Sequence, residues 1–150
     1  MIDYYLNLAC EEAKRGVEAN SGGPFGAVIC DSSGKVISCC HNRVLETHDP
    51  TNHAEVVAIR EACLRLGTHD LSGCTIYSSC EPCPMCLSAI IWANIEKVYC
   101  GASRIDCDNI GFRDKEIYDY INGKNNMISV EKVTNKKCVD LLNNYSNEVY

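Results

Sequence analysis

The chain has few basic residues and no long apolar run. Fourteen Lys and Arg stand against twenty Asp and Glu, which gives a formal net charge of −6. This balance argues against a broad nucleic-acid-binding surface. No apolar stretch approaches the roughly 20 residues that a membrane-spanning helix needs. The segment from Met1 to Leu6 carries an acid and no basic residue, so it does not read as a secretory signal. We expect neither a nucleic-acid partner nor a membrane.

Histidine and tryptophan are scarce as well, with four and one in the chain. His41, His48 and His69 have no ligand spacing to one another, so we expect them in loops or at the surface. His53 differs because a glutamate follows it two residues later. Trp92 could stack on a flat ligand, but core packing is the commoner fate of a lone aromatic residue.

Cysteine, in contrast, is abundant, with twelve in a chain of 150 residues. This length suits a single domain and exceeds that of most secreted disulfide scaffolds. Most of the cysteines fall among apolar neighbours, so we expect them to be small buried hydrophobes in a reducing cytoplasm. Only Cys80, Cys83 and Cys86 lie at metal-ligand spacing.

Apolar periodicity and turn residues predict an α/β fold. Helices are expected over 2–17, 52–66, 83–93, 114–121 and 136–145, and strands over 25–30, 35–41, 74–79, 95–101 and 127–133. The first two strands form a hairpin, and the two strand–helix–strand passages imply parallel pairs. The result is a mixed sheet with helices on both faces.

Two short motifs carry the chemistry. Residues Cys80 to Cys86 read Cys-Glu-Pro-Cys-Pro-Met-Cys, and His-Ala-Glu stands at His53 to Glu55. Three ligands from His53, Cys83 and Cys86 leave a tetrahedral zinc with one position for water, as in catalytic sites. His-x-Glu followed by Pro-Cys-x-x-Cys is typical of zinc-dependent nucleobase deaminases. Glu55 would then transfer protons between the water, the ring and the leaving amine.

The spacing of His53 and Glu55 sets a geometric condition. Residues two apart on a regular helix point in roughly opposite directions. The two side chains therefore converge only if His53 lies at the irregular start of its helix. Cys83 and Cys86 are three residues apart and share a helix face, where the helix dipole favours thiolate.

Other interpretations of these residues stay open at this point. Cys80 could be a fourth ligand in a closed structural zinc site, although Glu55 would then have no role. An iron–sulfur cluster could use the same cysteines, but the fourth cysteine of a bacterial ferredoxin run would fall at Ile90. Asn42 suits a hydrogen bond to a nucleobase edge as well as it suits a turn.

The motifs together resemble the cytidine-deaminase superfamily. They are Gly22 to Val28, Asp49-Pro50-Thr51 ahead of His53-Ala54-Glu55, and Ser79 to Cys86. A narrower resemblance, to the short bacterial guanine deaminases, rests on Gly22-Gly23-Pro24-Phe25, Trp92-Ala93, Gly111-Phe112-x-Asp114 and Tyr150.

This resemblance implies a three-layer α/β/α fold with a five-stranded mixed sheet. It implies one deaminase domain over 1–150, with 101–150 exchanged between the subunits of a homodimer. One zinc per subunit would be held by His53, Cys83 and Cys86, with water as fourth ligand, and Glu55 would be the proton shuttle.

The resemblance also implies a substrate pocket. Asn42 would contact the base and Ala54 would offer its backbone amide. The remaining pocket residues would be Phe25, Trp92, Phe112, Asp114 and Tyr150. Of these, Phe112, Asp114 and Tyr150 would cover a neighbouring subunit's site.

The expected function is hydrolytic deamination of a free purine base, guanine to xanthine and ammonia. Guanosine, cytosine, an aminotriazine or adenosine in transfer RNA could react by the same mechanism. The acidic charge argues against transfer RNA, because the only basic cluster is Lys136-Lys137. A non-catalytic zinc module that binds a nucleobase is the alternative from another class, and it leaves Glu55 unexplained.

Overall fold

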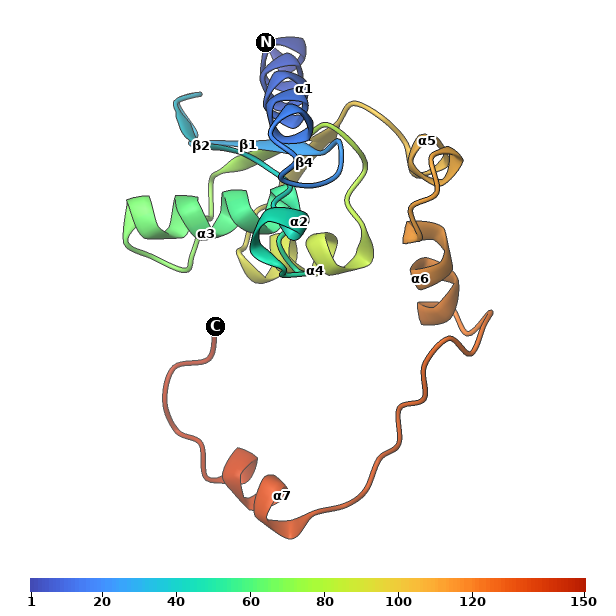
Figure 1. The fold of residues 1–150 in the computed structure, drawn as a ribbon. Helices are drawn as coiled ribbons and strands as arrows, with labels where there is room; N and C mark the ends of the chain where they lie inside the picture. The colour runs from blue at the N-terminus through green and yellow to red at the C-terminus, as the bar shows by residue number, and fades with distance from the viewer.

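The computed structural model describes residues 1–150 and is built around one four-stranded sheet (Figure 1). The strands are β1 (Gly26–Cys30), β2 (Val36–His41), β3 (Thr75–Ser78) and β4 (Lys97–Cys100). The helices are α1 (Ile2–Glu18), α2 (Val44–Thr47), α3 (Ala54–Leu66), α4 (Pro84–Trp92), α5 (Arg104–Asn109), α6 (Asp114–Ile121) and α7 (Lys136–Asn143).

The sheet is mixed, as expected, with strand order β2-β1-β3-β4. β1 pairs antiparallel with both β2 and β3, and β3 pairs parallel with β4. β2 and β3 run in the same direction, but β1 lies between them. The prediction of two adjacent parallel pairs is therefore right only for the passage through α4.

Helices cover both faces of the sheet, which confirms the three-layer arrangement. Ala27 and Ile29 of β1 belong to a core shared with α3 and α4, whereas Val28 and Cys30 pack with residues of α1. Side chains alternate between the faces of a strand. All five residues of β1 are buried because both faces are covered.

The predicted fifth strand, Met127 to Val133, does not form. These residues belong to no sheet, and Val133 is 84% exposed. Their β-branched composition favours a strand, but such composition reflects a fit to a pleated, half-buried surface. Here the segment runs away from the sheet, so the sheet has four strands and not five (Figure 1).

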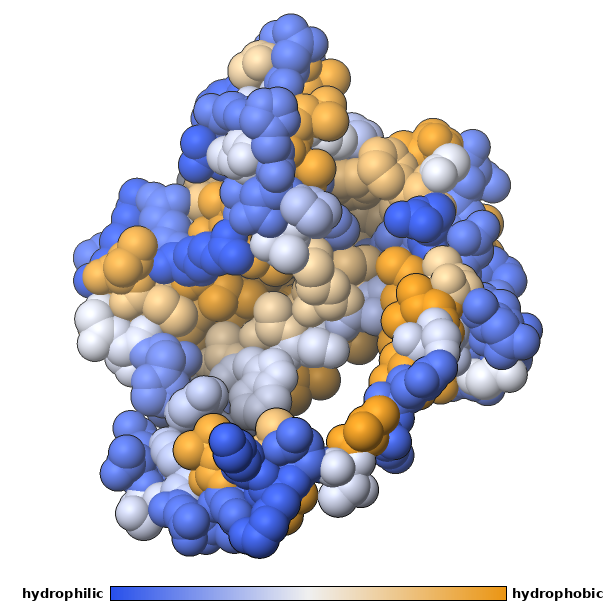
Figure 2. Space-filling view, turned by 60° about the horizontal axis from the view of Figure 1, so that its bottom comes forward, coloured by the Kyte–Doolittle hydropathy of each residue, from blue (hydrophilic) through white to orange (hydrophobic).

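Residues 122–150, called the C-terminal arm below, leave the body after α6 and curve back toward it (Figure 1). α7 has no buried residue and packs against no other helix or strand. Figure 2 shows exposed apolar side chains along the arm, and these include Val130, Leu141 and Leu142. The arm meets its own body at Tyr150, whose ring lies 5.7 Å from that of His69.

None of the helices combines the length and the apolar character needed to cross a membrane.

Candidate active site and metal centre

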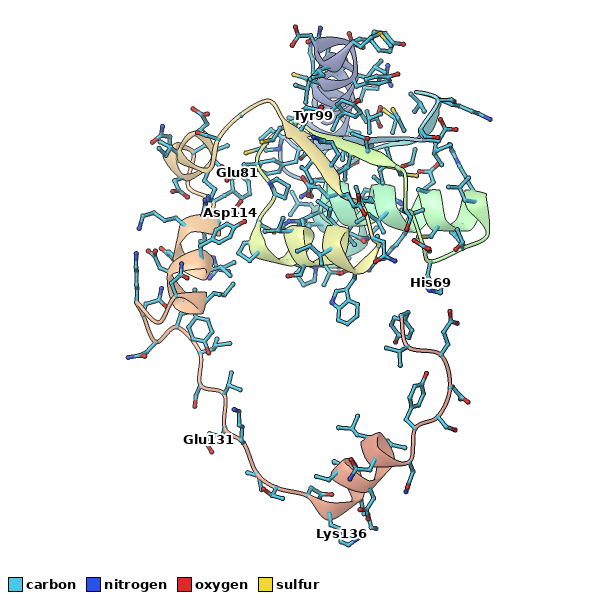
Figure 3. All side chains as sticks on the ribbon, turned by 180° about the vertical axis from the view of Figure 1, so that it is seen from behind. His69, Glu81, Tyr99, Asp114, Glu131 and Lys136 are labelled. Carbon is cyan, nitrogen blue, oxygen red and sulfur yellow. The ribbon has the colours of Figure 1, made fainter.

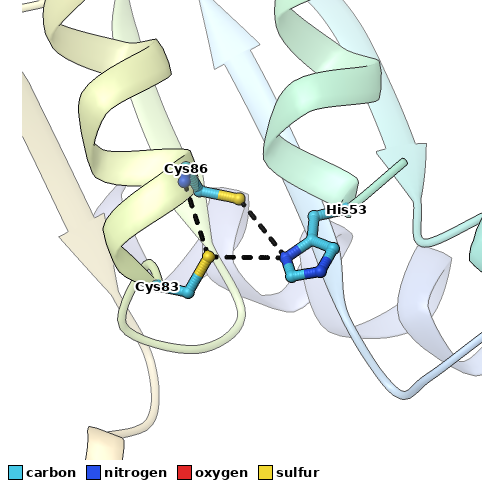
Figure 4. A group of neighbouring side chains, drawn as sticks. All are labelled: His53, Cys83 and Cys86. Atoms are coloured by element: carbon cyan, nitrogen blue, oxygen red, sulfur yellow. Dashed lines mark hydrogen bonds between the residues drawn. The ribbon is translucent and has the colours of Figure 1, made fainter. Parts of the chain in front are cut away.

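Three potential metal ligands meet where α3 and α4 begin (Figure 4). His53 is the N-cap of α3, with an extended backbone at φ −65° and ψ 155°. Cys83 is the N-cap of α4, and Cys86 lies in the first turn of that helix. His53 Nδ1 lies 3.5 Å from each of the two sulfur atoms. His53 thus satisfies the condition set by its spacing to Glu55, because it precedes the regular helix.

The spacing of these atoms fits zinc. Bond lengths of about 2.3 Å to sulfur and about 2.0 Å to nitrogen place a tetrahedral nitrogen–sulfur pair about 3.5 Å apart. The observed 3.5 Å separations agree with this value. All the ligand atoms of His53, Cys83 and Cys86 lie within 4.8 Å of one another. Three protein ligands leave one coordination position open, as in catalytic zinc sites.

The two thiols ionise unequally. The Cys86 thiol, as hydrogen-bond partner, lowers the pKa of Cys83, and His53 lowers it further. The same contact, together with burial, raises the pKa of Cys86. The hydrogen bond to Cys83 raises the pKa of His53. A bound metal ion would favour thiolate at both sulfur atoms.

Cys80 takes no part in this cluster. Its thiol donates a long hydrogen bond to the carbonyl oxygen of Ser103, at 3.6 Å. Ile90, at the position of a fourth ferredoxin cysteine, is buried in the core. A closed structural zinc site and an iron–sulfur cluster would each need a fourth cysteine ligand, and the structure provides none for either.

Glu55 lies in the first turn of α3 beside the metal ligands, and it is 5% exposed. It lines a cavity of about 20 Å³, which has room for about one water molecule. The lining residues are Phe25, His53, Glu55, Cys80, Glu81, Cys83 and Asp114. A buried carboxylate that is not itself part of the metal cluster can move a proton to and from a molecule held there.

Ser78 is a site residue that the sequence did not reveal. Its Oγ lies 2.6 Å from Glu55 Oε1 and 2.7 Å from the carbonyl oxygen of Cys80. When the Ser78 hydroxyl donates its proton to Glu55 Oε1, it fixes the orientation of the Glu55 carboxylate. The only sign of Ser78 in the sequence is that it is a polar residue in a segment predicted to be a buried strand.

Phe25, Phe112 and Asp114 gather at the same site. The Phe25 and Phe112 rings pack edge to face, with centroids 4.9 Å apart. Asp114 is the first residue of α6 and lines the cavity. Burial, with a contribution from Cys83, raises its pKa. Within the single chain, Asp114 lines the cavity and Phe112 contacts it through Phe25; that the two cover a neighbouring subunit's site stays a prediction.

The other predicted substrate residues lie elsewhere or make different contacts. Asn42 is buried and accepts a hydrogen bond from the backbone of Val44, as a turn residue does. Ala54 directly follows His53 and is fully buried. Trp92, which is 65% exposed, ends α4 and lies 6.2 Å from the ring of Tyr150, outside the cavity. Their roles toward a substrate stay predictions.

Comparison with known proteins gives consistent matches. Residues 1–102 match the cytidine and deoxycytidylate deaminase zinc-binding region. The guanine deaminase of Bacillus subtilis is 50% identical over 116 residues, which are 77% of this chain and 71% of that protein. A tRNA-specific adenosine deaminase of Aquifex aeolicus is 49% identical over 96 residues, which are 64% of this chain and 62% of that protein.

The fold agrees over a longer stretch. The crystal structure of the Bacillus subtilis guanine deaminase superposes with a TM-score of 0.89 and 40% identity. The match covers 99% of this chain and 97% of that one. The predicted relationship to the bacterial guanine deaminases is confirmed, and both metal-site motifs fall within the matched region. The chain belongs to the cytidine and deoxycytidylate deaminase family of zinc-binding proteins.

Proposed function

We propose that this protein is a zinc-dependent aminohydrolase that converts guanine and water to xanthine and ammonia. The observation that carries the proposal is an open three-ligand metal site that shares one cavity with the buried Glu55. A purely structural zinc site has no use for a carboxylate in that place. We further propose one zinc per chain, with water as its fourth ligand.

Zinc in such a site lowers the pKa of a water molecule to near 7 and so makes it a nucleophile at neutral pH. Glu55 would take one proton from a water molecule in the cavity and deliver it to the ring nitrogen. It would then take the second proton, from the hydroxyl now on the ring carbon, and deliver it to the departing amine. Ser78 holds the Glu55 carboxylate in place through its hydroxyl. The water contributes its oxygen to the ring carbon and its two hydrogens to the products, so the amine leaves as ammonia.

Phe25, Phe112 and Asp114 suit a flat base with N–H groups, and they would have to move apart to admit it, because the present cavity holds about one water molecule. The edge-to-face pair of Phe25 and Phe112 gives an apolar surface that excludes water. Asp114 places a carboxylate at the cavity, where it can accept a hydrogen bond from the base. Asn42 and the Ala54 amide are proposed as further contacts, as the resemblance implies.

Guanine is favoured over adenosine in transfer RNA for two reasons. The net charge of −6 is unfavourable for a polyanionic substrate. The structural match to guanine deaminase also extends over the whole chain, including α6 with Asp114. The twelve cysteines are all free, which fits the reducing cytoplasm in which we place the enzyme.

Ammonia release by the zinc-loaded protein tests the substrate. Guanine, guanosine, cytosine, adenosine and an aminotriazine are compared at equal concentration, with a transfer-RNA substrate in a separate arm. We expect release from guanine at a rate at least about 100-fold above the others, since a pocket built to bind specific polar groups strongly rejects molecules that lack them. Faster ammonia release from another of these compounds would contradict guanine as the substrate but would still support hydrolytic deamination as the reaction.

We also propose a homodimer that exchanges the C-terminal arm. The resemblance implies exchange of residues 101–150; because α5 and α6 pack against each other and α6 packs against α4 within the chain, we propose that residues 122–150 are the exchanged part. α7 has apolar residues and no partner in its own chain. A second copy is the occupant that would bury them, and Tyr150 would then reach the partner's site.

Deletion of Glu148 to Tyr150 tests the role of the tail. We expect kcat/KM for guanine to fall by about tenfold, as for a lost substrate-positioning group. Thermal unfolding should change little, because these terminal residues contribute nothing to the core of the chain. Light scattering on the same sample reports whether the dimer persists. If the shortened protein is still a dimer and its kcat/KM is unaltered, Glu148 to Tyr150 have no role in catalysis.

A further inference from the structure

We propose that Glu81, Arg104 and Tyr118 form a clamp that positions Asp114 at the active site. The proposal rests on the proposed function and deepens it. None of the three is a metal ligand or the proton shuttle. Their contacts tie the loop that carries Cys83 to the helix that carries Asp114.

The first half of the clamp joins Glu81 to Arg104. The Glu81 carboxylate accepts hydrogen bonds from the Arg104 backbone N–H at 2.9 Å and from Arg104 Nε at 3.2 Å. The Glu81 backbone N–H donates to the carbonyl oxygen of Ala102 at 2.8 Å. The residue two positions before Cys83 is thereby fixed to the start of α5.

The second half joins Arg104 to Tyr118 on α6. The Arg104 guanidinium carbon lies 4.0 Å from the centre of the Tyr118 ring, a cation–π contact. The Tyr118 hydroxyl donates a hydrogen bond to the carbonyl oxygen of Pro82 at 2.8 Å. Glu81 and Pro82 are consecutive, so the contacts form a closed ring through the loop just ahead of Cys83.

Tyr118 and Asp114 act as one unit on α6. They are four residues apart, so they lie on the same face of the helix. Figure 3 shows Asp114 at the end of α6 nearest the body, close to Glu81, and both line the cavity. A helix anchored at Tyr118 therefore presents Asp114 to the metal site.

α6 has few other anchors, and the one at Asp114 itself is a long hydrogen bond from the Cys107 thiol to Asp114 Oδ2, at 3.7 Å. None of its residues is buried, and it packs only against α4 and α5. Apolar burial usually fixes a helix on a protein, and here directional contacts must do much of that work. Catalysis is sensitive to such placement, because a shift of about 1 Å can cost about 100-fold. Loss of the clamp should therefore reduce activity more than it reduces stability.

The test compares Tyr118→Phe with Tyr120→Phe on the same helix. Tyr118→Phe keeps the ring over Arg104 and removes only the hydrogen bond to Pro82, whereas Tyr118→Leu removes both contacts. We expect kcat/KM for guanine to fall about tenfold in Tyr118→Phe and further in Tyr118→Leu. Tyr120→Phe should stay within about twofold, with zinc content unchanged in all three.

A double-mutant cycle shows whether Tyr118 acts through Asp114. In a chain that already carries Asp114→Asn, Tyr118→Phe should cause no further loss, because contacts that share one function are not additive. An equal fold-loss in both backgrounds would overturn the positioning role. So would an Asp114→Asn variant with undiminished activity, since Asp114 would then not be what the clamp positions.

Hydrogen exchange gives a readout that needs no substrate. In Tyr118→Phe the α6 amides should exchange at least about tenfold faster, with α3 unchanged. If the unmodified protein does not turn over guanine, the proposed function fails while this measurement still decides whether the clamp holds α6. Unchanged exchange in α6 overturns the clamp.

Discussion

Glu55→Gln is expected to abolish guanine turnover while the fold and the zinc are retained. The amide has the shape of the carboxylate and can still accept the Ser78 hydrogen bond, so the buried site loses no volume. It cannot take a proton from water and return it, and such proton transfer contributes about 10²–10⁴ in rate. We expect a loss at the upper end of this range, because one residue serves both the attack and the departure of ammonia. Ammonia release and zinc content are measured on the same sample.

Glu61→Gln is the matched control, since it removes one carboxylate from the same helix at a site away from the cavity. Glu61 contacts Arg65 and the Cys40 thiol. Its activity should stay within about twofold. Substantial turnover by zinc-loaded Glu55→Gln would remove Glu55 from the mechanism.

Cys83→Ala is expected to lose zinc, activity and stability together. Cys83 is buried and supplies one of the three ligand atoms, so only His53 and Cys86 would remain. Binding of zinc to a folded site is linked to folding, because the unfolded chain holds no preformed site. A chelator should lower the unfolding temperature of the unmodified protein and leave that of Cys83→Ala unchanged. Metal analysis and thermal unfolding with and without chelator are the measurements.

Cys80→Ala controls for the loss of a buried thiol near the same loop. Cys80 donates to the Ser103 carbonyl oxygen and lies outside the metal cluster. The Cys80→Ala variant should bind as much zinc as the unmodified protein, and a chelator should lower its unfolding temperature in the same way. Zinc at the unmodified level in Cys83→Ala would show that the ligand assignment is wrong.

The metal site was predictable from the sequence because its chemistry depends on short spacings. Cys83 and Cys86 lie within one turn of α4, and His53 lies just before the helix that carries Glu55. Each pair is brought close by local geometry alone. The long-range step is the meeting of two helix starts, which follows because α3 and α4 pack on the same face of the sheet and contact each other.

The contacts of α6 could not be read from the sequence. Tyr118 meets Pro82 across 36 positions, and Arg104 meets Glu81 across 23. No local periodicity encodes such pairs. The same limit explains why Ser78 was missed beside Glu55.

The prediction of a fifth strand was wrong for a different reason. The residues from Met127 to Val133 have strand-like composition, but a strand is stable only when it has a partner to pair with. Whether the chain docks that segment on the sheet is decided by the arm as a whole, and the arm runs away from the sheet (Figure 1).

Zinc titration of the metal-free protein, with guanine turnover followed at each step, tests the central claim most directly. Turnover should rise in proportion to added zinc and level off at one zinc per chain, as expected for a single centre at His53, Cys83 and Cys86. Guanine turnover that is undiminished without metal, or that is absent when one zinc per chain is bound, would contradict the account.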